Sequence, residues 1–180
     1  MRIAPEITKN KAPAWNNNKM SFAKIYTRGL LGLHAPQIEV EVHISSGLPS
    51  LTIVGLPEAA VRESKDRVRS AIINSGFQFP TKRLTINLAP ADLPKDGSRL
   101  DLPIALGILI ASGQLPEEST NGFEFIGELA LDGHLRSISG ALTIAMACQQ
   151  AQHRLLLPVP NLEDASQLPN FPVSRATHPT

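Results

Sequence analysis

The loop Pro94–Asp101 gathers side chains that could do chemistry, because lysine, serine, arginine and two aspartates fall within eight residues. A serine is a nucleophile only beside a base, and a lysine serves as that base only when its pKa is lowered. Lys95 precedes Ser98 in a loop that we expect to be exposed, so it stays protonated near neutral pH. We therefore expect Asp96 and Ser98 to bond loop backbone, and Gly97 to supply an unusual backbone conformation.

Metal and phosphate chemistry have weaker support in the sequence. The five histidines are His34, His43, His134, His153 and His178. They show no three- or four-residue spacing and no cysteine partner, so we expect surface histidines and no metal site. No glycine-rich segment ends in Gly-Lys-Ser or Gly-Lys-Thr, so the phosphate cradle of an ATPase is missing. We expect no cofactor in this chain.

The elements before the loop follow from the spacing of apolar residues. Residues 38–44 alternate with period two, which predicts a half-buried strand, and residues 51–54 predict a second strand paired with it as an antiparallel hairpin. Pro57 suits the first turn of a helix that should run to about Asn74. Along that helix, Arg62 with Asp66 and Glu63 with Arg67 should form exposed pairs.

The elements around and after the loop complete the fold. Residues 83–88 predict a strand, and the apolar run 101–110 predicts a helix enclosed by other elements. Strands at 124–129 and 134–138 should be joined by a turn at Asp132-Gly133, at the end of a second notable loop, Gly127–Gly133. A helix at 140–150 and a buried strand at 154–157 follow. This order predicts an α/β (α+β) fold with a mixed sheet and packed helices.

Composition bounds the class of protein. At 180 residues and 42% hydrophobic the chain suits one domain, and a formal charge of +1 gives no general attraction to a polyanion. Residues 1–19 are basic and predict a disordered tail, and the proline-rich residues 169–180 predict a linker or frayed end. The single cysteine, Cys148, lies in an apolar run and excludes an internal disulfide. We expect a cytoplasmic protein with no membrane segment.

Four segments resemble the ComM/YifB family, bacterial magnesium-chelatase-like proteins in which a Lon-protease-like domain precedes an AAA+ ATPase. The segments are Tyr26–Gly32, Gly55–Ser64, Asn87–Lys95 and Gly127–Leu129. The resemblance extends over residues 20–168 and implies a fold similar to the Lon-protease catalytic domain. It also implies that the AAA+ module lies beyond this chain, which would then be a fragment or a truncated product.

Both protease positions are altered in this sequence, if the resemblance is followed residue by residue. Active Lon-type proteases have a proline and then the nucleophilic serine after Pro-Lys-Asp-Gly, where this chain has Ser98 and Arg99. Counting from Gly127, the position of the catalytic lysine falls on Leu142. Neither an arginine nor a leucine can perform these roles. We therefore expect no catalytic residue and no enzyme activity in this chain.

The resemblance implies a supporting role in a hexameric helicase that promotes branch migration during natural transformation and recombination. ATP and Mg²⁺ would be cofactors of the full-length relative, and the partners would be further copies of the chain and DNA. The candidate contacts with nucleic acid or with another subunit are Lys82, Arg83, Lys95 and Arg99. Two alternatives remain, which are a serine peptidase with rearranged catalytic residues and a pure oligomerisation domain.

Overall fold

The structure, a computed structural model, describes residues 21–95, 97–168 and 173–176. The predicted tail at residues 1–19 lies outside this range, as do residues 169–172 and 177–180 of the predicted linker. The main sheet contains β1 (Ser21–Arg28), β2 (Gln37–Ser45), β4 (Arg83–Ala89) and β3 (Ser50–Val54), in that order. The first three run antiparallel, whereas β3 runs parallel to β4. The protein is therefore mixed α/β, as predicted.

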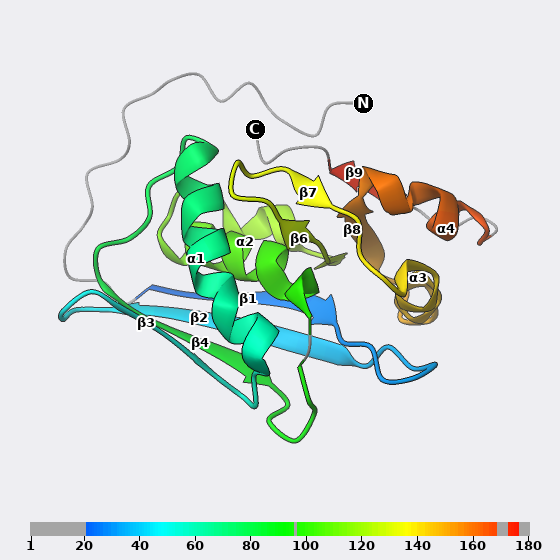
Figure 1. Cartoon of the computed structure of the whole chain (residues 1–180), viewed down its shortest axis with the longest axis horizontal. Helices are drawn as coiled ribbons and strands as arrows, with labels where there is room; N and C mark the ends of the chain where they lie inside the picture. Colours follow the sequence, from blue (N-terminus) through cyan, green and yellow to red (C-terminus); the bar gives the residue numbers. More distant parts are fainter. Residues whose placement is uncertain (1–20, 96, 169–172, 177–180) are drawn as a thin grey trace.

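The helices α1 (Ala59–Asn74) and α2 (Asp101–Ala111) lie on one face of this sheet (Figure 1). The alternation in β2 determines which side of the strand faces the helices, since Ile38, Val40, Val42 and Ile44 are all buried. Ten of the eleven residues of α2 are buried, which confirms that an all-apolar helix must be enclosed. One hydrophobic core thus joins the sheet to both helices.

The predicted hairpin between β2 and β3 is wrong. β4 lies between these two strands in the sheet. β3 and β4 are parallel, and the chain passes from β3 to β4 through the helix α1. The link after β2 passes the start of β4, where a Cβ on Gly47 would lie 3.5 Å from Nε of Arg83. Local turn patterns could not reveal a strand that enters the sheet about thirty residues later.

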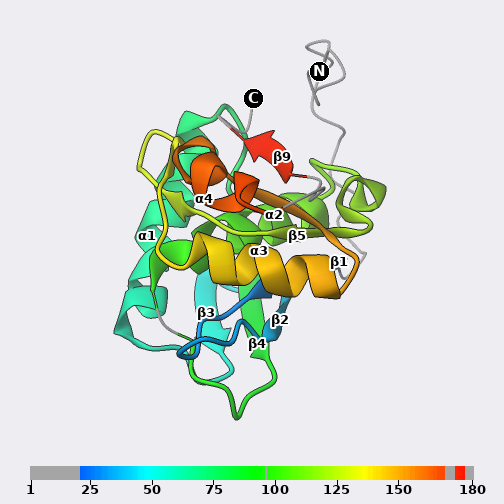
Figure 2. The same ribbon diagram turned by 90° about the vertical axis from the view of Figure 1, so that its right-hand side faces the viewer.

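A second, smaller layer holds β5 (Phe123–Phe125), β8 (Arg154–Pro158) and β9 (Val173–Ala176) in parallel. Two further helices, α3 (Ala141–Gln150) and α4 (Leu162–Ser166), accompany this layer, and α3 packs on β8 over a second core that includes Cys148 (Figure 2). The 3-10 turns are Ser98–Leu100, Glu117–Thr120 and Val159–Asn161. The linker prediction is wrong for residues 173–176, which form β9.

The predicted strand 124–129 is divided in two. After β5 the chain bends, and β6 (Glu128–Leu129) pairs antiparallel with β7 (Leu135–Arg136) as the predicted hairpin. At the division, the Gly127 amide donates to Arg99 O at 3.0 Å, and the Leu102 amide donates to Gly127 O at 3.0 Å. A Cβ on Gly127 would lie 2.7 Å from Leu135 Cδ2, so a larger residue here would require the Leu135 side chain to move. The hairpin is thereby fixed to the start of α2.

Among the described residues, no helix combines the length and the apolar character needed to cross a membrane.

Candidate functional site

The loop between β4 and α2 meets two distant segments of the chain. The Glu58 amide, just before α1, donates to Lys95 O at 3.0 Å, and Pro57 forms an isolated parallel bridge with Lys95. At the other end of the loop, the carbonyl oxygen of Arg99 accepts the hydrogen bond from the Gly127 amide. The start of α1, the loop and the β6–β7 hairpin therefore form one site, which includes the residues that the sequence singled out.

Lys95 is fully buried, so the prediction of an exposed lysine is wrong. The backbone contacts with Pro57 and Glu58 hold the loop inward, and the Lys95 Nζ donates to Pro90 O. Burial lowers the pKa of Lys95 below its ordinary value, although Asp92 opposes the shift. A neutral lysine is a base, but this amine is directed at a carbonyl oxygen, which carries no proton to transfer.

Ser98 makes a side-chain contact that the sequence did not reveal. Its Oγ donates to Oε2 of Glu128 on β6, rather than to loop backbone as predicted. The other carboxylate oxygen of Glu128 lies 3.5 Å from Nη1 of Arg136 on β7. Gly97 has φ +77°, which confirms its predicted conformation, and Asp96 lies outside the described residues. The serine hydroxyl thus links the loop to the hairpin.

Asp101 at the start of α2 is buried and bound to α1. Nε and Nη2 of Arg67 donate to its two carboxylate oxygens at 2.8 Å and 3.1 Å, and the Leu129 amide donates at 3.3 Å. Arg67 was predicted to pair with Glu63, but its salt bridge is with Asp101. Burial raises the pKa of Asp101 to about 6 in spite of Arg67. This carboxyl group titrates closer to neutrality than any exposed aspartate would.

Arg99 and Leu142, the two positions predicted to correspond to protease residues, both carry packed side chains. Arg99 is only 8% exposed, and its guanidinium lies over Gly97, where an added Cβ would be 3.3 Å from Nη2. Leu142 is half-buried in the first turn of α3. Gly140 precedes that turn with φ +76°, and a Cβ added to it would lie 2.6 Å from Leu30 Cδ2.

The four candidate contact residues do not form one patch. Lys82 and Arg83 lie where β4 begins, half-buried and exposed respectively, whereas Lys95 and Arg99 follow its other end and are buried. A strand of seven residues separates the pairs by about 20 Å. Of these four residues, Lys82 and Arg83 are the ones accessible to a phosphate in this conformation.

A second polar centre was missed by sequence reasoning. Arg28 is buried and donates from Nε and Nη2 to Glu124 at 2.6 Å and 2.8 Å. Gln37 Nε2 and His153 Nδ1 lie 3.0 Å and 2.7 Å from Glu124 Oε1. The available signal was a glutamate between phenylalanines in β5. Within the described ranges, no three of His, Cys, Asp and Glu are placed to hold a metal ion.

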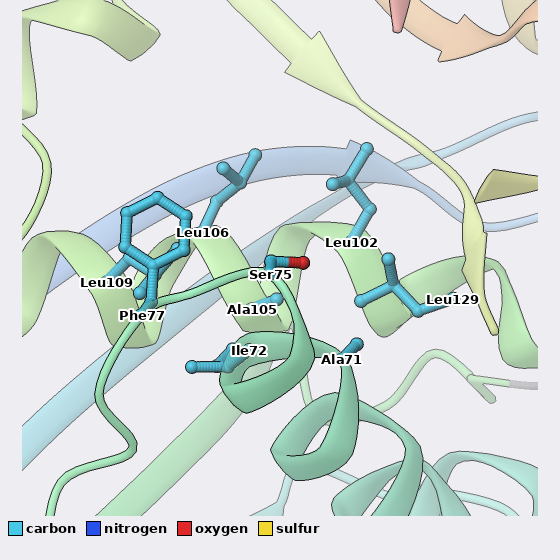
Figure 3. Close-up of a pocket in the computed structure, with 9 residues that line it drawn as sticks. All are labelled: Ala71, Ile72, Ser75, Phe77, Leu102, Ala105, Leu106, Leu109 and Leu129. Atoms are coloured by element: carbon cyan, nitrogen blue, oxygen red, sulfur yellow. The ribbon is translucent and has the colours of Figure 1, made fainter. Parts of the chain in front are cut away.

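An apolar pocket between α1 and α2 is too small to be a ligand site (Figure 3). Its volume is about 20 Å³, which is room for a group the size of water. Its lining residues are Ala71, Ile72, Ser75, Phe77, Leu102, Ala105, Leu106, Leu109 and Leu129. Ser75 supplies a buried hydroxyl without a hydrogen-bond partner. This pocket is therefore not the candidate site.

Residues 40–161, about two thirds of the chain, match the family described as subunit ChlI of Mg-chelatase. The chain belongs to this family. The matched range holds the whole loop site, the hairpin and Glu124, but not Arg28. Membership of the ChlI family confirms the magnesium-chelatase-like relationship that the sequence segments indicated.

Several proteins resemble this ChlI-family chain along most of its length. It is 55% identical over 142 residues to the uncharacterised protein YifB of Salmonella typhimurium, which covers 79% of this chain and 28% of YifB. It is 50% identical over 147 residues to the competence protein ComM of Haemophilus influenzae, covering 82% and 29% respectively. An uncharacterised Mycobacterium bovis protein is 39% identical over 148 residues, covering 82% and 29%. The chain spans less than a third of the length of these curated relatives.

Proposed function

We propose that this chain is a non-catalytic Lon-like N-terminal domain of a ComM-type AAA+ ATPase. In this role it assists hexamer assembly and DNA engagement by a branch-migration helicase in natural transformation and recombination. The observation that carries the proposal is the 50% identity with the competence protein ComM over 147 residues. The mixed sheet, with α1 and α2 on one face, supports the Lon-like assignment.

The absence of peptidase chemistry is supported by the loop site. Arg99 stands at the predicted nucleophile position and is packed over Gly97, and the hydroxyl of Ser98 is bound by Glu128. Lys95 points to Pro90 O, which leaves Ser98 without a lysine base. These contacts favour a loop that holds α1, α2 and the hairpin together over a loop that attacks a peptide bond.

ATP and Mg²⁺ belong to the remainder of the full-length protein in this proposal. The residues of this chain do not fit a nucleotide, because no glycine-rich segment ends in Gly-Lys-Ser or Gly-Lys-Thr. ATP hydrolysis would supply the work of the helicase, and this domain would position its subunits and the DNA.

DNA contact is assigned to Lys82 and Arg83, the accessible pair. In the full-length protein, replacing both with alanine should weaken binding to DNA at low salt. Each phosphate contact that is lost should reduce the slope of log affinity against log salt by about 0.9. Lys65→Ala on α1 is the matched control and should leave the slope unchanged. If the double variant keeps the wild-type slope, the domain serves oligomerisation without DNA contact.

The peptidase alternative has its own test. A fluorophosphonate probe and an unfolded protein substrate should leave the wild-type chain unlabelled and the substrate intact. Labelling that disappears in Ser98→Ala would establish a reactive serine and overturn the non-catalytic assignment.

A further inference from the structure

Strand β3 is an open edge of the main sheet. It pairs with β4 on one side, and no other described strand lies on its free side (Figure 1). The opposite edge differs, because the end of β1 is tied to β5 through Arg28 and Glu124. The free side of β3 therefore presents backbone N–H and C=O groups that are available to another strand.

The segment that carries this edge has no charged residue from Ser45 to Pro57. Sheet edges are usually protected from pairing by lysines or other charges, by bulges or by prolines within the strand. Here Pro49 and Pro57 only flank β3. The sequence thus leaves this edge without the usual protection.

The outward row of β3 is uncharged and consists of Ser50, Thr52 and Val54, all of them exposed. Leu48 and Leu56, which are 82% and 56% exposed, lie in the turns beside the strand. Only Leu51 and Ile53 of the strand turn towards the core. Uncharged side chains therefore border the free hydrogen-bonding groups along the whole strand.

We propose that β3 is a contact with a second copy of this chain, paired antiparallel around a twofold axis at Thr52. This register places Ser50 opposite the partner's Val54 and Thr52 opposite its own copy. Each copy then presents the same uncharged row to the other. Because the segment carries no charge, nothing on it repels an identical copy or attracts a charged peptide.

The contact is short, since the ladder spans five residues of each chain. Interfaces below about 1,000 Å² are weak, so association depends on concentration. A twofold contact uses the same surface on both copies, whereas a closed ring of six needs two different surfaces. The β3 contact therefore joins two chains, or two rings, and is independent of the proposed hexamer function.

The first test is the mass of the chain in solution. Sedimentation equilibrium should show the 19.4 kDa chain approaching twice that mass as its concentration rises. Val54→Lys places a charge in the outward row and should weaken dimerisation at least tenfold. Met146→Lys, on α3 and 46% exposed, is the matched control and should dimerise as the wild type does.

The second test is the register. Oxidation should link Thr52→Cys chains to one another, because each lies opposite its own copy within disulfide reach. Ser50→Cys chains should remain unlinked, since their two Cα atoms would be about 13 Å apart. Cys148 is buried and does not compete.

The proposal fails if the wild type stays monomeric, if Val54→Lys dimerises like the wild type, or if the two cysteine variants link equally. None of these results would affect the DNA-binding test, so the two proposals fail separately.

Discussion

Two buried arginine–carboxylate pairs hold different parts of this molecule, and they share the same geometry. Arg28 binds Glu124 through Nε and Nη2 at the joint between the two sheets. Arg67 binds Asp101 through the same two nitrogens at the candidate loop site. Both carboxylate side chains are fully buried. The pairs differ in the exposure of the arginine side chain, which is 9% for Arg28 and 24% for Arg67, and in the remaining neighbours of each carboxylate.

The two carboxyl groups nevertheless titrate in opposite directions. Burial alone would raise the pKa of Glu124, but bonds from Arg28 and His153 outweigh burial, and the pKa falls below its ordinary value. For Asp101 burial wins, and the pKa rises to about 6. Glu124 has Gln37 and His153 close by, whereas Asp101 gains only a 3.3 Å amide and has the Glu128 carboxylate nearby. Arg28 makes the largest contribution that lowers the pKa of Glu124, and the bond from His153 adds to it, whereas Asp101 has only a weak backbone donor beside Arg67.

Replacing each arginine with methionine should give the largest difference. Arg28→Met leaves Glu124 buried without its main partner and should lower the free energy of unfolding at pH 7 by about 3–5 kcal/mol. Arg67→Met should cost less, about 1–3 kcal/mol, because Asp101 can take up a proton and Arg67 is 24% exposed. Urea denaturation measures both variants. Equal losses would mean that the extra donors around Glu124 do not matter.

Asp101 should also make stability depend on pH in a particular direction. Its pKa is raised from 3.8 to about 6, so its contribution is full below pH 4 and is lost as pH rises through about 6. The shift corresponds to about 3 kcal/mol. The unfolding free energy of the wild type, minus that of Asp101→Asn, should therefore fall by about this amount between pH 4 and pH 7.

Glu124→Gln serves as the control of opposite sign. The lowered pKa of Glu124 means that its contribution is present above its ordinary value of 4.5 and is lost as pH falls through its folded pKa. Two difference curves with the same slope would contradict the comparison.

The fold was largely predictable because most of its elements carry local patterns. The alternation in β2 and the apolar run of α2 each set a buried face, and both are confirmed. The failures concern partners distant in the chain. The sequence of β3 contains nothing that specifies β4 as its neighbour. β9 depends on pairing with β8, and its proline-rich surroundings do not predict a strand.

The candidate site was predicted in position but not in chemistry. The sequence located the loop and its neighbouring hairpin, yet it could not show that Lys95 is buried or that Ser98 reaches Glu128. Burial of a polar loop depends on backbone bonds to α1 and to Gly127, which lie far along the chain in both directions. The Arg28–Glu124 pair spans 96 residues and left only a single glutamate in an apolar strand as its signal.

The smallest effect should come from the histidine that completes the Glu124 centre. His153 Nδ1 lies 2.7 Å from a carboxylate that is fully buried, so His153→Ala removes a contact that solvent does not readily replace. The loss should be about 0.5–1 kcal/mol in the free energy of unfolding, since the His153 side chain is itself 37% exposed. His134 offers the matched control. Its Nδ1 lies 3.2 Å from Asp132, but both side chains are more than 60% exposed, so His134→Ala should leave stability unchanged. If both variants behave alike in urea, the donors around Glu124 act only through Arg28, and the contrast with Asp101 needs another cause.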